Sequence, residues 1–151
     1  MAGIIMEKKV KIQINSTQDL VEGESDVIEF EEEGIFYIKN DIYYLVYKNQ
    51  AEGLDGARTI VKIDPGQDQI IILRSKPAKM EQTFRKDETL EGSYSTQYGN
   101  LRIKNKTEVL EYNLNQTGGK INLVYDLFIN NQKYTKNKLK ISYQDFGVES
   151  C

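Results

Sequence analysis

The segment KINLVYDLFIN, Lys120–Asn130, alternates apolar and polar side chains, interrupted only by Val124 and Phe128. Its odd positions from 121 to 129 are all apolar or aromatic, while Asn122 and Asp126 occupy even positions. Because successive side chains of a β-strand point to opposite faces, period-two alternation predicts a strand with one buried and one wet face. The same alternation recurs near the N-terminus, from Val10 to Ile14.

The composition of the whole chain of 151 residues agrees with this pattern. Ile, Val and Thr total 33 residues, whereas Ala, the strongest helix former, occurs only four times. We predict about ten strands and no helix, with strands at 10–14, 27–30, 35–38, 42–47, 59–63, 70–73, 80–84, within 100–116, at 121–129 and from 134. Turn signals separate them: Glu33-Gly34, Asn40-Asp41, Asp64-Pro65-Gly66 (type II chemistry), Pro77, Gly99, Gly118-Gly119 and Asn130-Asn131.

A change of register inside residues 100–116 favours a barrel over an open sheet. The apolar positions begin odd, at Leu101 and Ile103, and end even, at Leu110 and Leu114. One flat strand cannot hold both sets on one face, so we predict a bulge or bend near Thr107–Val109. Such bends curl sheets into barrels, which have no edges to protect. We therefore predict one all-β domain over 1–151, an up-and-down antiparallel barrel with a core at about 8–145 and short loose termini.

Charge and residue types exclude several classes of function. The net charge is -3, which argues against a nucleic-acid partner. The chain has no His, and its one Cys is Cys151, so His-based triads, His-ligated metals and internal disulfides are excluded. We expect no metal site and no cofactor. No window is apolar enough for a membrane span and the N-terminus does not resemble an export signal, so we expect no membrane partner and a cytoplasmic location.

Several short motifs, taken in order, resemble those of the small bacterial YwiB-like proteins. They are Ile72-Leu73-Arg74-Ser75, Met80, Phe84, Tyr94-Ser-Thr-Gln-Tyr98-Gly99-Asn-Leu101, Lys106-Thr107 and Tyr125-Asp-Leu127. The aromatic-x-Thr-x-Tyr-Gly stretch is the most specific of them, and the likeness extends from about Val10 to Tyr143. The resemblance implies a calycin-type, lipocalin-like β-barrel in a bacterial cytoplasm, and it implies no activity because the family has none assigned.

Arg74 is the strongest candidate for a binding residue. It directly follows the apolar run Ile70–Leu73, which is typical of a strand buried on both faces. A charge at the end of such a strand needs a partner. That partner is either a ligand carboxylate or an internal acid such as Glu52 or Glu81.

Tyrosines are the second candidate group, because the chain contains ten of them. A tyrosine combines an apolar ring with a polar tip, which suits the wall of a cavity holding a partly polar molecule. With Arg74, we predict ligand contacts from Tyr47, Tyr94 and Tyr98. Tyrosines serve equally well to fill a barrel that has no cavity.

A basic patch is the third candidate. Hairpin turns at Gly118-Gly119 and Asn130-Asn131 would gather six residues at one end of the barrel, namely Arg102, Lys104, Lys106, Lys133, Lys136 and Lys138. Such a patch would steer an anionic ligand or partner, and lysines also protect exposed strands from edge-to-edge pairing.

Three functions follow from these residues. The first is binding of a small anionic amphipathic molecule in the interior or mouth of the barrel. The second is an interaction module that docks a macromolecular partner through its outer face or basic end. The third is an unrecognised enzyme, which the missing residue types disfavour. The residues leave the oligomeric state open.

Overall fold

The computed structural model describes residues 4–20, 23–49, 57–75 and 78–145. The regular secondary structure of this part of the chain consists of ten β-strands. They are β1 (Ile4–Leu20), β2 (Ser25–Lys39), β3 (Ile42–Asn49), β4 (Ala57–Asp64), β5 (Gln69–Arg74), β6 (Lys79–Arg85), β7 (Thr89–Thr96), β8 (Gly99–Leu114), β9 (Gly118–Ile129) and β10 (Gln132–Asp145). Residues 1–3 and 146–151 of the predicted loose termini lie outside the described residues, as does Glu52, whereas residues 4–7 belong to β1.

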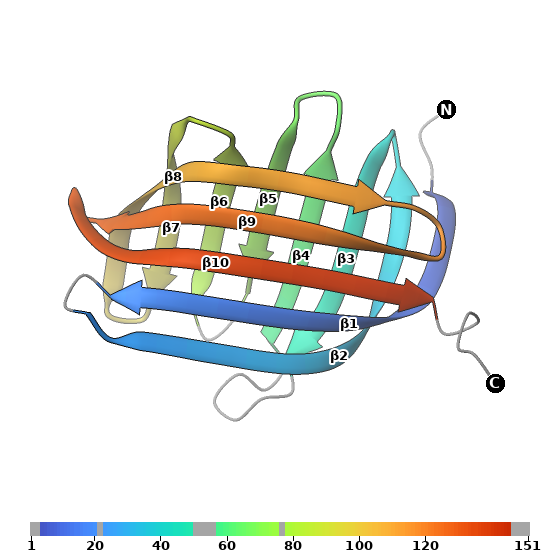
Figure 1. Ribbon diagram of the computed structural model, residues 1–151, viewed down its shortest axis with the longest axis horizontal. Coiled ribbons are helices and arrows are strands. Elements are labelled where there is room, and N and C mark those ends of the chain that lie inside the picture. The colour runs from blue at the N-terminus through green and yellow to red at the C-terminus, as the bar shows by residue number, and fades with distance from the viewer. Residues whose placement is uncertain (1–3, 21–22, 50–56, 76–77, 146–151) are drawn as a thin grey trace.

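The ten strands form one closed antiparallel barrel, which confirms the predicted fold. Each strand pairs with its neighbours in sequence, and β1 also pairs with β10 to close the cylinder. In Figure 1, the long strands β1, β2 and β8–β10 run across the front, and β3–β7 cross behind them at a steep angle. The barrel is therefore flattened into two crossed layers that share one interior.

The predicted irregularity in β8 is present where alternation required it. Thr107 pairs with Tyr125 and Val109 pairs with Val124, so Glu108 is an extra residue in the ladder between β8 and β9. The bulge brings Ile103 and Leu110, which have opposite parity, onto the same buried side. This one residue allows a strand of 16 residues to follow the curved wall.

The prediction of a turn at Glu33-Gly34 is wrong, because β2 runs through both residues without a break. A Cβ built on Gly34 would meet Ile12 Cδ1 and the backbone oxygen of Val46. Glycine is thus required here for close approach, at the residue where β2 pairs with β1 and begins to pair with β3. Figure 1 shows β2 bending from the front layer toward the back layer. The predicted count of strands came out right because two errors cancelled: β2 was split in two, and β7 was not foreseen.

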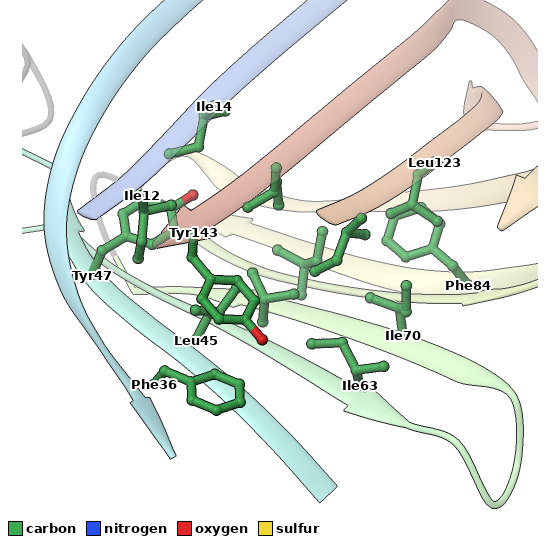
Figure 2. Close-up of a cluster of buried hydrophobic side chains, with 14 of the residues drawn as sticks. Ile12, Ile14, Phe36, Leu45, Tyr47, Ile63, Ile70, Phe84, Leu123 and Tyr143 are labelled. Carbon is green, nitrogen blue, oxygen red and sulfur yellow. The ribbon is translucent and has the colours of Figure 1, made fainter. Parts of the chain in front are cut away.

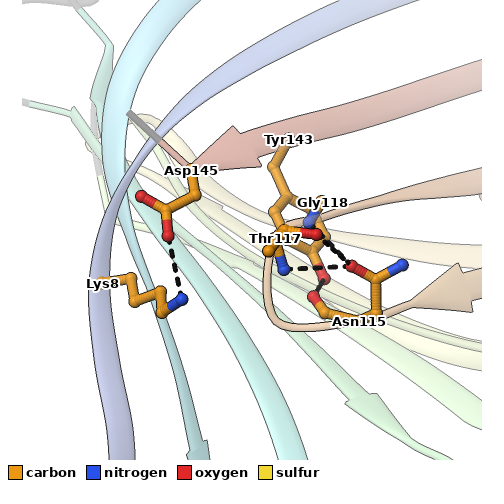
Figure 3. A network of polar contacts seen from close by, with 6 residues as sticks. All are labelled: Lys8, Asn115, Thr117, Gly118, Tyr143 and Asp145. Atoms are coloured by element: carbon orange, nitrogen blue, oxygen red, sulfur yellow. Dashed lines mark hydrogen bonds and ion pairs between the residues drawn. The ribbon is translucent and has the colours of Figure 1, made fainter. Parts of the chain in front are cut away.

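The prediction of a hairpin turn at Gly118-Gly119 is also wrong, since both glycines belong to β9. The turn is built by Asn115, whose side-chain oxygen accepts hydrogen bonds from the backbone N–H groups of Thr117 and Gly118, each at 3.0 Å (Figure 3). The hydroxyl of Tyr143 donates to the carbonyl of Asn115 at 2.7 Å. A Cβ on Gly119 would lie 2.6 Å from the Tyr143 ring, so this glycine makes room for the ring.

The residues of three further hairpin turns explain the backbone conformations of those turns. Asn40-Asp41 and Asn130-Asn131 have positive φ at both positions, as type I′ turns require, and both were predicted as turns. The turn at Asp64-Pro65-Gly66 is not type II, because the positive φ of this connection falls on Asp68. Asp64 Oδ1 instead accepts a hydrogen bond from the Gly66 N–H at 3.1 Å.

The apolar core fills one end of the barrel. The Phe36 and Tyr143 rings stack with centroids 4.7 Å apart, and Ile63 and Ile70 line the same end from β4 and β5 (Figure 2). Farther along, the Phe84 ring lies 4.7 Å from that of Tyr125. These side chains close the end at which β2 joins β3 and β4 joins β5, which leaves only the opposite end for a cavity.

We predict that Gly119→Ala lowers the free energy of unfolding by about 1–3 kcal/mol, because the added methyl group overpacks the Tyr143 ring. Gly66→Ala is the matched control: the nearest atom to its Cβ is Asp64 Oδ1 at 3.4 Å, so it should stay close to wild type. Urea denaturation of the three proteins measures the difference. Equal stabilities would contradict the packing described for Tyr143.

Candidate functional site

The open end of the barrel contains an internal cavity of about 450 Å³. Its wall is mainly apolar, with isoleucines and leucines from β1, β2, β5 and β8–β10. Polar side chains interrupt the wall at a limited number of positions, namely Ser16, Gln18, Tyr47, Thr59, Arg74, Gln82, Tyr94, Tyr125, Tyr134 and Asn137. A volume of this size falls in the range of small-molecule sites.

Arg74 points into the cavity because of its place in β5. Ile70, Ile72 and Arg74 share the inner face of this strand, and the two isoleucines are buried in the core. Across the ladder, Arg74 lies opposite Thr59 of β4 and Met80 of β6, which also line the cavity. The Nε atom of Arg74 is buried and has no hydrogen-bond partner among the described residues.

Of the two acids proposed as partners of Arg74, the structure describes only Glu81, and Glu81 does not lie beside it. Glu81 is exposed on the outer face of β6, whereas Met80 and Gln82 on either side of it line the cavity. Glu52 lies outside the described residues. Among the residues that the structure describes, no carboxylate forms an ion pair with Arg74, and Arg74 is the single charged residue of the cavity wall.

Two buried tyrosine hydroxyls lie within the field of this arginine. Burial raises the pKa of Tyr47, and the positive charge of Arg74 opposes that rise. Burial likewise raises the pKa of Tyr125, against a hydrogen bond from Asn137 and the charge of Arg74. The Asn137 Nδ2 donates to the Tyr125 hydroxyl at 3.0 Å. Both tyrosines are therefore neutral at physiological pH and have hydroxyl protons to donate.

The structure brings together three of the four residues predicted as ligand contacts. Arg74, Tyr47 and Tyr94 all line the cavity, whereas Tyr98 lies in the turn between β7 and β8 with 91% of its surface exposed. The backbone N–H of Tyr98 donates to Thr96 Oγ1, which fixes the turn and keeps the ring out of the barrel.

Sequence reasoning missed seven polar residues of the wall, of which four are buried, namely Thr59, Gln82, Tyr125 and Asn137. Tyr125 was visible as an inward position of the alternating segment 120–130. The other three stand in strands where polar residues occupy both faces, so alternation does not mark them as internal.

The predicted basic residues lie on the outer face, on the two strands that flank β9. Lys106 and Lys136 both oppose Asp126 of β9, one from each side. Two of the six carry acidic partners: Lys133 lies 3.4 Å from Asp126, and Lys136 lies 3.2 Å from Glu108. The patch is thus partly neutralised by acids of its own surface.

An apolar rim surrounds the open end of the cavity. Ile28, Leu101 and Tyr134 line the cavity and are also 40–50% exposed, at 50%, 40% and 49% respectively. They stand near the open ends of β2, β8 and β10. The apolar wall therefore continues from the interior to the solvent.

A closed ten-stranded up-and-down β-barrel, filled at one end and hollow at the other, is the class of protein that these elements define. The chain belongs to the family described as "Domain of unknown function (DUF1934)", whose model matches residues 12–141. This membership confirms the resemblance drawn from the sequence motifs.

Two comparisons with one bacterial protein agree with that family. The chain is 28% identical over 123 residues to the "Uncharacterized beta-barrel protein YwiB" of Bacillus subtilis (strain 168), covering 82% of this chain and 84% of that protein. It is also similar to the crystal structure of ywiB protein from Bacillus subtilis, with a TM-score of 0.83, 25% identity and 94% coverage of each chain. A search of the described residues for a helix of membrane-spanning length and hydropathy finds none.

We predict that alkaline pH destabilises the barrel in part through Tyr125. Because burial raises its pKa in the folded state, its contribution is fully present below the unfolded value of about 10 and is lost as the pH rises above it. At neutral pH, Tyr125→Phe should lower the free energy of unfolding by about 1–3 kcal/mol, because Asn137 Nδ2 loses its acceptor. Above pH 10, the free energy of unfolding of this variant should fall less steeply with pH than that of the wild type.

Urea denaturation at a series of pH values measures both effects. Tyr98→Phe changes an exposed turn residue and is the matched control, which should follow the wild type. Parallel alkaline curves for wild type and Tyr125→Phe would contradict the burial described for this hydroxyl.

Proposed function

We propose that the barrel binds a small anionic amphipathic molecule, with the anionic group on Arg74 and the apolar part along the cavity wall. The observation that carries this proposal is the buried Nε of Arg74. Among the residues that the structure describes, this atom has no hydrogen-bond partner and the wall of the cavity that Arg74 lines contains no acid. The Arg74 side chain is partly exposed, but its Nε donor is shielded from water. A buried donor of a charged group is costly to leave unpaired, and an anionic ligand would supply the acceptor.

The charge of the site supports a monoanion, and a carboxylate in particular. One guanidinium balances one negative charge, whereas a dianion would bring an uncompensated charge into the barrel. Carboxylate geometry also matches the planar fork of arginine donors. The neutral hydroxyls of Tyr47 and Tyr125 would donate further hydrogen bonds to the same group.

The shape of the cavity supports an apolar body attached to that carboxylate. At the roughly 30 Å³ that a water molecule occupies in the liquid, 450 Å³ holds about fifteen non-hydrogen atoms. Apolar side chains make up most of the wall, and Ile28, Leu101 and Tyr134 carry it to the rim. An alkyl chain would leave the head group and extend toward this rim.

The polar groups of the wall favour binding over catalysis. A general base needs a pKa near the working pH, and burial moves the pKa values of Tyr47 and Tyr125 upward, away from neutrality. We therefore assign them to ligand recognition. A lipocalin-like carrier of a small molecule in the bacterial cytoplasm is the role that fits these features.

Titration with decanoate and with decan-1-ol, its uncharged counterpart, tests the proposal. We predict that the wild type binds decanoate at least tenfold more tightly than the alcohol, because Arg74 contacts the carboxylate. Arg74→Met should keep the volume of the side chain and remove the charge, so it should bind both compounds alike. Isothermal titration calorimetry gives the four dissociation constants.

Two further measurements make the outcome decisive. Removing a partly buried cation that has no ion-pair partner among the described residues should leave the melting temperature of Arg74→Met equal to or above that of the wild type. If the variant unfolds instead, Arg74 is a structural residue and the proposal fails. It fails equally if Arg74→Met still prefers decanoate to the alcohol.

A further inference from the structure

Three polar atoms of the cavity wall have no hydrogen-bond partner among the described residues. They are Thr59 Oγ1, Arg74 Nε and Asn137 Oδ1, contributed by β4, β5 and β10. The side chains of Thr59 and Asn137 are 1% and 4% exposed, so bulk water does not solvate them. Buried polar atoms in folded proteins normally have partners, and an unpaired one costs free energy.

These three atoms belong to one region of the cavity. Thr59 and Arg74 lie opposite each other in the ladder between β4 and β5. From the far wall, Asn137 Nδ2 donates to the Tyr125 hydroxyl at 3.0 Å, and the charge of Arg74 acts on that same hydroxyl. Thr59, Arg74 and Asn137 all line this one cavity, so a single ligand would contact all three side chains.

A simple carboxylate satisfies only part of this set. An ionised carboxylate has acceptor oxygens and no donor, so it can receive hydrogen bonds from Arg74 Nε and the Thr59 hydroxyl. Asn137 Oδ1 is itself an acceptor and would remain unpaired beside it. A ligand that matches all three atoms must bring a hydrogen-bond donor close to its carboxylate.

We infer that the ligand is a carboxylic acid whose apolar chain carries a hydroxyl or an amide N–H next to the carboxylate, with this donor bound by Asn137 Oδ1. The inference rests on the proposed function, since it describes the head group of the molecule held by Arg74. Hydroxylated fatty acids and N-acylated amino acids share this chemistry, and both carry the apolar chain that the cavity wall accommodates.

The test compares three carboxylates with the wild-type protein: decanoate, 3-hydroxydecanoate and N-octanoylglycine. We expect at least one donor-bearing compound to bind about tenfold more tightly than decanoate, because it alone satisfies the buried Asn137 oxygen. The compound that gains affinity identifies the source of the donor. In Asn137→Leu, a change of similar volume, the ratio between the affinities for the donor-bearing acid and for decanoate should fall to about one.

The wild-type comparison decides the inference by itself, even if Asn137→Leu fails to fold. If decanoate binds and both donor-bearing acids bind no more tightly, the inference is overturned and the proposed function stands. If none of the three carboxylates binds, the proposed function fails and the inference fails with it. A donor-dependent advantage that persists in a folded Asn137→Leu protein would overturn the assignment to Asn137.

Discussion

Closure of the sheet through the ladder between β1 and β10 is the constraint on which the rest of the structure depends. This ladder joins the first strand to the last, and it extends from the pair of Val10 with Asp145 to the pair of Leu20 with Thr135. Without it, the barrel would be an open sheet with two long unpaired edges. With it, ten strands enclose more interior than an apolar core of this size fills. The cavity and the burial of Arg74 both follow from that closure.

The interior has a filled end and a hollow end, because the two ends of the strands contribute side chains of different size. Phe36, Tyr143 and Phe84 are large enough to fill one end with stacked or tilted rings. Toward the other end, the inward positions carry Thr59, Arg74 and smaller or polar groups, which leave space between them. An unpaired cation beside empty volume is a poor arrangement for stability alone. It is a good arrangement for recognising an anion, because the site is formed before the ligand arrives.

The sequence was informative where one physical rule dominated, and less so where two rules competed. In residues 100–116, the apolar positions change from odd to even numbers, and only a bulge keeps the odd-numbered and the even-numbered apolar residues on the inner face. This change located the bulge at Thr107–Val109. Gly34 and Gly119 were mistaken for turn residues, since a glycine required for close packing looks the same in sequence. Arg74 was predicted as a site residue from the apolar run that precedes it, and Tyr47 from the combination of ring and hydroxyl that tyrosine offers to a cavity wall. Asn137 was not, because its strand has polar residues on both faces and only the register shows which face is internal.

Native mass spectrometry of the protein, purified without denaturant, tests the central claim most directly. If the unpaired guanidinium holds a physiological anion, the folded wild type should have a mass above that of the chain alone, and the released compound should be an amphipathic carboxylate. The Arg74→Met protein, purified in parallel, should lose most of this added mass. Folded wild-type protein with the mass of the bare chain would contradict the account.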